Sequence, residues 1–260
     1  MRGIPMRALI PNAVTVLALC VGLSSVRFAL QDNWEGALAF IVIAGVLDGF
    51  DGRIARLLNG QTRFGAELDS LSDVIAFGVS PGIIVYLWVL QDMPRYGWIF
   101  ALAFAAACAL RLARFNANID VDEQPHKSAG FLTGVPAPTG AGLLFLPIFL
   151  WLVTGEEALR SFYIMAPWTA LVTYLLVSNV ATFSWSSIRL RSGFRFGALA
   201  GIAAIIAALV TVPWIMFVAL SVAYALSIPF SVASYAKIRR QRAQNEAGAT
   251  MDPASDAATP

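Results

Sequence analysis

Four aspartates interrupt a chain that is otherwise strongly apolar. They are Asp48, Asp51, Asp69 and Asp73. Of the 260 residues, 58% are apolar and only 13% are charged, which is the composition of a polytopic membrane protein. A carboxylate at membrane depth costs roughly a few kcal/mol, so such residues normally mark a functional site. These aspartates therefore limit both the fold and the chemistry of the chain.

The spacing of the aspartates predicts a cation site. Asp48 and Asp51 are three residues apart, and Asp69 and Asp73 are four apart, so each pair shares one helix face. A short turn between two helices would bring the pairs together. Clustered carboxylates cannot all ionise in a poorly solvated site without a compensating cation. Their hard oxygen ligands suit Mg²⁺, Mn²⁺ or Ca²⁺ rather than a soft metal.

Long apolar stretches predict an all-α polytopic membrane protein with about eight transmembrane helices. The expected spans are residues 6–28, 35–57, 66–90, 96–118, 135–154, 160–184, 194–211 and 213–236. Pro213 separates the last two, because proline interrupts a helix. We expect one integral-membrane domain over residues 1–242. Residues 243–260, rich in Ala, Asp, Pro and Thr, are expected to form a disordered cytoplasmic tail.

The basic residues are divided unequally between the two sides of this predicted bundle. Fifteen Lys and Arg residues fall on the side of both termini, and only Arg27, Arg95 and Arg160 fall opposite. The positive-inside rule therefore places both termini and the aspartates on the cytoplasmic side of the inner membrane. Two further basic clusters on that side indicate topology and attraction to anionic headgroups, not nucleic-acid binding. They comprise Arg189, Arg191 and Arg195, and Arg239, Arg240 and Arg242.

Small and cationic residues accompany the aspartates. Gly52 and Ala55 lie on or near the face of the first pair, where small side chains let a ligand approach the backbone. Arg56 follows one turn later, and Thr62 lies in the loop between the helices. An arginine beside metals can hold an anion, and this combination suits the phosphoryl group of a lipid. A cation or proton transporter is the alternative, but it does not explain Gly52, Arg56 and Gly65.

These residues form one specific motif. It reads Asp48-x-x-Asp51-Gly52-x-x-Ala55-Arg56, eight residues, then Gly65-x-x-x-Asp69-x-x-x-Asp73. The motif resembles the signature of the CDP-alcohol phosphatidyltransferases without a departure, and Asn12-x-x-Thr15 is similar to that family's first-helix pattern. The resemblance implies a six-helix core, usually dimeric, with a polar cavity that faces the cytosol. Two C-terminal helices would extend that core here.

The resemblance also implies a reaction and roles for its residues. The four aspartates would hold two divalent cations, Mg²⁺ or Mn²⁺, and Asp73 would also accept the proton of the attacking hydroxyl. CDP-diacylglycerol would be bound by Gly52, Arg56, Thr62, Asn12 and Thr15. An alcohol would replace CMP on the phosphate attached to diacylglycerol. Direct attack is expected, because no activated Ser, Cys or His nucleophile is apparent.

A second segment bears on the acceptor alcohol. It contains Arg111-Leu-Ala-Arg114-Phe-Asn116, then Lys127 and Gly134-Val-Pro136-Ala-Pro138. The segment resembles the phosphatidylserine synthase branch of the family, with valine in place of the usual leucine. The carboxylate of L-serine needs a cation, which Arg111, Arg114 or Lys127 would supply, with Asn116 as a polar contact. Choline, glycerol 3-phosphate or an inositol phosphate are alternative acceptors, and the arginines could instead anchor a helix end.

Overall fold

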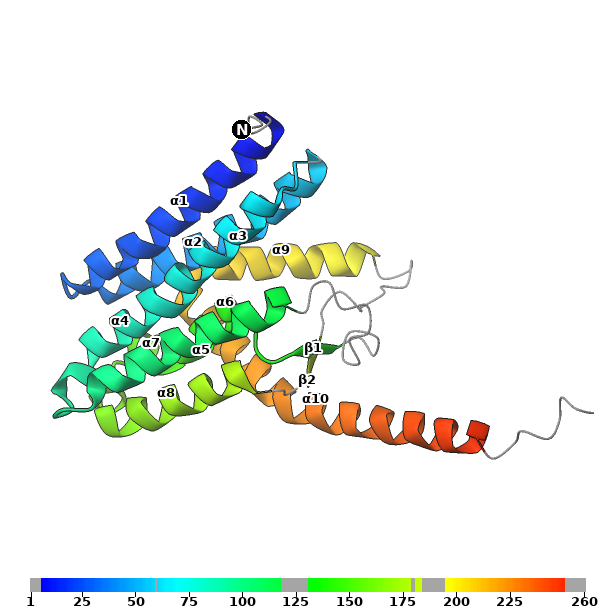
Figure 1. Cartoon of the computed structure of the whole chain (residues 1–260). Helices are drawn as coiled ribbons and strands as arrows, with labels where there is room; N and C mark the ends of the chain where they lie inside the picture. The colour runs from blue at the N-terminus through cyan, green and yellow to red at the C-terminus, as the bar shows by residue number, and fades with distance from the viewer. Residues whose placement is uncertain (1–5, 59, 118–130, 179–180, 184–194, 251–260) are drawn as a thin grey trace, which may run out of the picture.

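The computed structural model describes residues 6–58, 60–117, 131–178, 181–183 and 195–250 as a helical bundle (Figure 1). Its helices are α1 (Met6–Ala29), α2 (Trp34–Leu57), α3 (Arg63–Asp73), α4 (Ser80–Trp88), α5 (Gly97–Ala117), α6 (Ala137–Leu144), α7 (Leu146–Thr154), α8 (Phe162–Val177), α9 (Arg195–Thr211) and α10 (Pro213–Thr250). A π-helical turn, Val74–Val79, joins α3 to α4. Short 3₁₀ turns cover Leu90–Asp92 and Glu157–Leu159.

Within the part of the chain that the structure describes, four helical segments are long and apolar enough to cross a membrane. They are Leu9–Ala29, Arg63–Trp88, Gly97–Ala117 and Pro213–Ser231, and the bent pair α6 and α7 makes a fifth. This pattern identifies a polytopic helical membrane protein but does not reach the eight expected spans. The 24-residue helix α2 carries Asp48, Asp51 and Arg53 near its end, and α8 has only 16 residues. The charges of α2 and the short length of α8 therefore explain why these two expected spans are not among the membrane-crossing segments.

The expected span 135–154 is broken into α6 and α7, whose axes differ by 42°. Pro147 explains the break, because proline has no backbone N–H and its ring clashes with the carbonyl four residues earlier. That carbonyl belongs to Leu143, and it accepts a hydrogen bond of 2.8 Å from Trp168 Nε1 of α8. A neighbouring helix thus satisfies the carbonyl that the break releases, as membrane burial requires.

The expected span 160–184 is also too long. Helix α8 ends at Val177, and residues Ala181–Phe183 form strand β2, which pairs antiparallel with β1 (Phe131–Thr133). Between β1 and α6, Gly134 has a φ of +75°, a left-handed conformation that favours glycine. The strand pair thus lies at the end of the bundle where α5 and α8 both finish (Figure 1).

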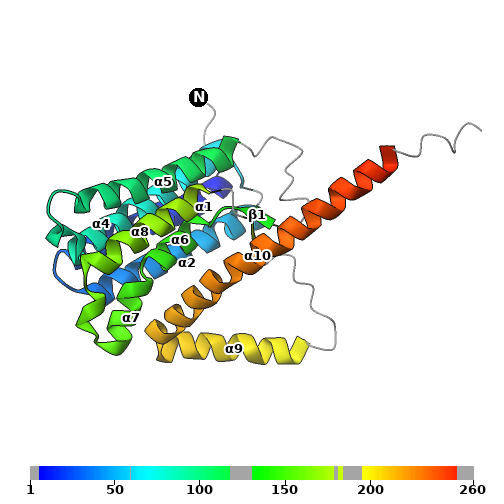
Figure 2. The same cartoon turned by 90° about the horizontal axis from the view of Figure 1, so that it is seen from below.

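Helix α10 continues past the boundary expected for the tail. It runs to Thr250 and so includes residues 243–250, the first part of the expected tail. Ala, Gln and Glu in this segment are good helix formers and extend the preceding turns. Figure 2 shows α10 crossing the bundle obliquely and extending beyond it, with α9 joined to its beginning. Residues 251–260 lie outside the described part of the chain.

An arginine ties four elements together at the end of the bundle opposite the aspartates. Arg160 donates from Nε to the carbonyl oxygen of Trp88 at 3.2 Å. Its guanidinium also lies 5.6 Å from the ring centre of Trp34 and 5.7 Å from that of Trp151. Cation–π contacts of this kind stabilise a partly buried cation. Arg160 therefore fixes α2, α4 and α7 relative to the start of α8.

Candidate active site

The four motif aspartates meet between α2 and α3. Asp48, Asp51 and Asp69 each place a carboxylate oxygen within 4.8 Å of the others. The carboxyl group of Asp73 contacts that of Asp48. Asp51 is only 4% exposed. Only a few residues separate the end of α2 from the start of α3, so the spacing within each helix and the short connection together produce the cluster.

This cluster fits a hard divalent cation. Its donors are carboxylate oxygens, the ligand type that Mg²⁺, Mn²⁺ and Ca²⁺ prefer. Two carboxylates in contact repel each other unless a proton or a cation lies between them. Since Asp48 and Asp73 are in contact and two further carboxylates adjoin them, bound cations would remove a strong repulsion.

Helix α1 holds the aspartate cluster from one side. Thr15 is buried, and its Oγ1 donates to Asp51 Oδ2 at 2.6 Å. Ser72, which immediately precedes Asp73, donates from Oγ to the carbonyl oxygen of Thr15 at 3.3 Å. One residue of α1 therefore contacts both helices that carry the aspartates, and it orients the Asp51 carboxylate directly.

A π-helical turn follows the last aspartate without a break. Val74–Val79 adopts this wider helix, and the residues after it resume the α-helix as α4. Such turns are uncommon and often occur at functional sites, where they change the direction of side chains. At Gly78, an added Cβ would lie 2.8 Å from Cys108 Cβ, so the turn packs very closely on α5. The turn thus sets the angle around the helix axis between the side chain of Asp73 and the buried side chains of α4.

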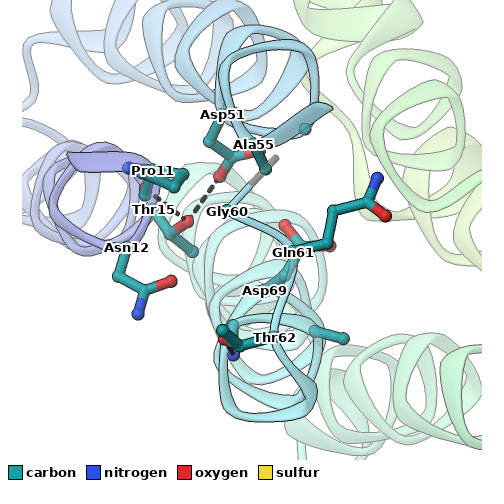
Figure 3. Close-up of a pocket in the computed structure, with 12 residues that line it drawn as sticks. Pro11, Asn12, Thr15, Asp51, Ala55, Gly60, Gln61, Thr62 and Asp69 are labelled. Carbon is teal, nitrogen blue, oxygen red and sulfur yellow. Dashed lines mark hydrogen bonds between the residues drawn. The ribbon is translucent and has the colours of Figure 1, made fainter. Parts of the chain in front are cut away.

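A pocket of about 320 Å³ opens beside the cluster (Figure 3). Its walls come from α1, α2, the connecting turn and α3. Twelve residues line it: Pro11, Asn12, Thr15, Asp51, Gly52, Ala55, Gly60, Gln61, Thr62, Gly65, Ala66 and Asp69. The labelled side chains of Thr15 and Asp51 point toward each other across its wall, joined by their hydrogen bond (Figure 3).

The two motif glycines at this pocket have different surroundings. An added Cβ at Gly52 would meet no atom within 4 Å, so this residue leaves open space in the pocket. At Gly65, the same atom would lie 2.8 Å from Asn12 Oδ1 and 3.2 Å from Thr62 Oγ1. Thr62 is the N-cap of α3 and accepts from the Gly65 N–H at 3.0 Å. Gly65 thus leaves room for the side chains of Asn12 and Thr62 to approach α3, whereas Gly52 leaves its space open to a ligand.

Most of the residues expected to bind the donor lie at this pocket. Asn12, Thr15, Gly52 and Thr62 line it, whereas Arg56 is exposed on the last turn of α2 and is not among its lining residues. Sequence reasoning missed Gln61, a polar side chain of the connecting turn. No motif position marks that residue, because it falls among the eight unspecified residues between Arg56 and Gly65.

The residues expected to bind serine separate into different environments. Arg114 donates from Nη1 to Val177 O at 2.9 Å and from Nη2 to Ser178 O at 3.3 Å. Asn116 donates from Nδ2 to Ser70 Oγ at 2.9 Å and so contacts α3 between its two aspartates. Arg111 is partly buried and within electrostatic range of Asp73. Lys127 lies outside the described residues.

The fold and this pocket define a class of membrane protein: a helical bundle with a carboxylate site near one end. Residues 8–185 match the family model described as CDP-alcohol phosphatidyltransferase, and residues 194–229 match the one described as CDP-alcohol phosphatidyltransferase 2. The chain belongs to the CDP-alcohol phosphatidyltransferase family. The resemblance carried by the aspartate motif is therefore confirmed.

Three curated relatives share the name CDP-diacylglycerol–serine O-phosphatidyltransferase. The Mycobacterium tuberculosis protein is 37% identical over 233 residues, which cover 90% of this chain and 81% of the relative. The Helicobacter pylori protein is 36% identical over 177 residues, covering 66% and 70% of the two chains. The Bacillus subtilis protein is 31% identical over 171 residues, covering 66% and 88%.

Proposed function

We propose that this membrane enzyme transfers the phosphatidyl group of CDP-diacylglycerol to the hydroxyl of L-serine, giving phosphatidylserine and CMP. The observation that carries the choice of serine is the 37% identity, over 90% of the chain, to a relative whose name specifies that acceptor. The aspartates support the transfer chemistry, because Asp48, Asp51 and Asp69 lie close enough to share a cation and two of them, Asp51 and Asp69, line a pocket with space for a nucleotide.

The pocket suits the CDP part of the donor. Gly52 leaves room for the diphosphate against α2, and the N-terminus of α3 presents backbone N–H groups to an anion. Asn12, Thr15 and Thr62 offer polar contacts at the same pocket. Arg56 would contribute from the exposed end of α2, through its charge rather than through the pocket wall.

Asp48, Asp51, Asp69 and Asp73 would hold two divalent cations, Mg²⁺ or Mn²⁺, which neutralise the diphosphate and the departing CMP when bound. The serine hydroxyl oxygen forms a bond to the phosphorus that carries diacylglycerol, and the bond from that phosphorus to CMP breaks. The hydroxyl proton passes to the Asp73 carboxylate. Asp73 suits this role because its carboxyl group contacts that of Asp48 and is within electrostatic range of Arg111.

Arg111 would receive the serine carboxylate, since it is a partly buried cation of the acceptor segment within electrostatic range of Asp73. Asn116 would act by holding α3 through Ser70, and Arg114 by holding the end of α8. Lys127 is the remaining candidate of that segment. Choline, glycerol 3-phosphate and an inositol phosphate are the alternative acceptors for the same reaction.

The membrane arrangement proposed here keeps the eight helices expected from the sequence. A six-helix core extended by two C-terminal helices would occupy residues 1–242, and the protein would act as a homodimer, as the family resemblance implies. The distribution of Lys and Arg supports a cytoplasmic position for both termini and for the aspartates, at the inner membrane. Cysteine labelling from each side of the membrane, at introduced sites near both termini, would test this orientation.

Release of CMP by the purified protein tests the proposed function. CDP-diacylglycerol and Mn²⁺ or Mg²⁺ are supplied with each candidate alcohol in turn. We expect metal-dependent release with L-serine and a lipid product that contains the serine. Asp73→Asn should abolish turnover while the folded protein remains in the membrane. Release with a different alcohol alone would overturn the serine assignment, and turnover by Asp73→Asn would exclude that residue as the base.

A further inference from the structure

Helix α3 carries two of the four aspartates, but apolar packing holds it only lightly. Among its residues, all of which the structure describes, only Ser72 is buried, whereas Leu71 is 63% and Phe64 59% exposed. Both α2 and α3 pack against α1, and they contact each other directly at few points. An element with so little buried apolar surface is not fixed by packing alone. The direction of its aspartates toward α2 therefore depends on polar contacts.

Two serines between the aspartates of α3 supply such contacts. Ser72 donates from Oγ to the carbonyl oxygen of Thr15 on α1. Ser70 Oγ accepts from Asn116 Nδ2 of α5 at 2.9 Å and donates to the carbonyl oxygen of Ala66 at 3.1 Å. Because the one hydroxyl proton of Ser70 is used on its own helix, Asn116 must present the N–H group of its amide. The two bonds are thus mutually consistent.

The two serines hold α3 from opposite sides. Residues two apart in an α-helix are separated by about 200° around its axis, so Ser70 and Ser72 point to different neighbours. One neighbour is α1, and the other is the end of α5. Rotation of α3 about its axis would break these bonds, and it would turn Asp69 and Asp73 away from the aspartates of α2.

We propose that Ser70 and Asn116 are positioning residues for the metal ligands of α3, fixing the rotation at which Asp69 and Asp73 face the aspartates of α2. Neither side chain needs to touch a cation or a substrate for this role. Asn116 belongs to the segment expected to bind the acceptor, and its Nδ2 donates to Ser70. One hydrogen bond thereby joins the acceptor segment to the cation site. This inference rests on the proposed function and deepens it, because it concerns the same aspartates.

Binding of Mn²⁺ to the purified full-length protein tests the inference without turnover. The electron paramagnetic resonance signal of free Mn²⁺ falls as the ion binds, so a titration gives the dissociation constant. We expect Ser70→Ala and Asn116→Ala each to raise that constant about tenfold, the lower end of the loss seen when a group that holds a metal ligand is removed. Alanine favours a helix more than serine does, so weaker binding by Ser70→Ala would not reflect a weaker helix.

Ser24→Ala is the matched control. Ser24 also donates to the carbonyl oxygen four residues earlier, that of Cys20 at 2.7 Å, but it lies on α1 and does not line the pocket. Its Mn²⁺ dissociation constant should equal that of the wild-type protein. Adding Asn116→Ala to Ser70→Ala should weaken Mn²⁺ binding little further, because both substitutions remove the same hydrogen bond.

The KM for L-serine at saturating Mn²⁺ separates positioning from direct contact. A side chain that only holds α3 should leave this KM unchanged once the cations are bound. If Asn116 instead contacted the acceptor, Asn116→Ala would raise the KM and Ser70→Ala would not, and that result would overturn the inference. Wild-type Mn²⁺ affinity in either variant would also overturn it. A metal-free Tm lowered in both variants relative to Ser24→Ala would do the same, because the bond would then support the fold in general.

The wild-type protein distinguishes failure of this inference from failure of the proposed function. Absence of Mn²⁺ binding to the wild type would refute the cation site itself. Absence of CMP release with serine would refute the proposed reaction. Both results are obtained before any variant is compared.

Discussion

Gly52→Ala should make the protein more stable and less active at the same time. Gly52 lies inside α2, where alanine is favoured over glycine by about 1 kcal/mol. Its new Cβ would meet no atom of the protein within 4 Å, so no clash offsets this gain. We therefore expect the free energy of unfolding to rise by about 1 kcal/mol, which raises the Tm by roughly 2–4 °C for a chain of this length.

The same methyl group would occupy the pocket where the donor approaches the backbone. Forcing an additional methyl group into a well-packed contact typically costs about 1–3 kcal/mol. That cost corresponds to a rise of roughly 5- to 150-fold in the KM for CDP-diacylglycerol. The loss is confined to donor binding, so the KM for serine should not change.

Gly49→Ala provides the control for this experiment. Gly49 lies three residues earlier on α2 and also has open space around an added Cβ, but it does not line the pocket. Both variants should gain stability, measured by tryptophan fluorescence during heating in detergent. Only Gly52→Ala should lose donor affinity, measured by CMP release at saturating serine. Equal donor KM values in the two variants, or a lower Tm for Gly52→Ala, would refute the reasoning.

Three further outcomes are expected. Thr15→Val removes the hydroxyl that donates to Asp51, so half-maximal activity should need about 10- to 100-fold more Mn²⁺; an unchanged requirement would contradict this. Arg160→Lys loses the planar contacts with Trp34 and Trp151, so unfolding free energy should fall by about 1–2 kcal/mol with both KM values unchanged. Chelation with EDTA should stop CMP release until Mn²⁺ or Mg²⁺ is added back, and activity that survives chelation would exclude the cations.

The sequence predicted the aspartate cluster well because its geometry is local. Spacings of three and four residues place two carboxylates on one helix face, and a short turn brings the two helices together. The contacts of Arg114 and Asn116 could not be predicted in this way. Each reaches a partner more than forty residues away, in α8 and in α3 respectively. Nothing in the sequence of α5 alone distinguishes an arginine that caps a neighbouring helix from one that meets a substrate.

The helix boundaries were less predictable than the site. Hydropathy marks apolar length but not the direction of the chain, so the bend at Pro147 and the end of α8 at Val177 were both missed. Helix α2 shows the opposite problem. Its functional charges lower its apolar character although it lies within the bundle. In a membrane enzyme, charged reactive residues lie on the membrane helices themselves, so they lower the hydropathy by which those helices are predicted.

The π-helical turn after Asp73 gives the third long helix a spare residue. Elsewhere in such a helix, deleting one position would rotate every later side chain by about 100° and ruin the packing. Within Val74–Val79, a deletion could instead be absorbed by tightening the turn to an ordinary α-helix. The π-helical turn therefore separates the aspartates of α3 from the core residues of α4. A one-residue deletion in this turn would change the angle between the two sets of side chains and leave the packing within each set intact.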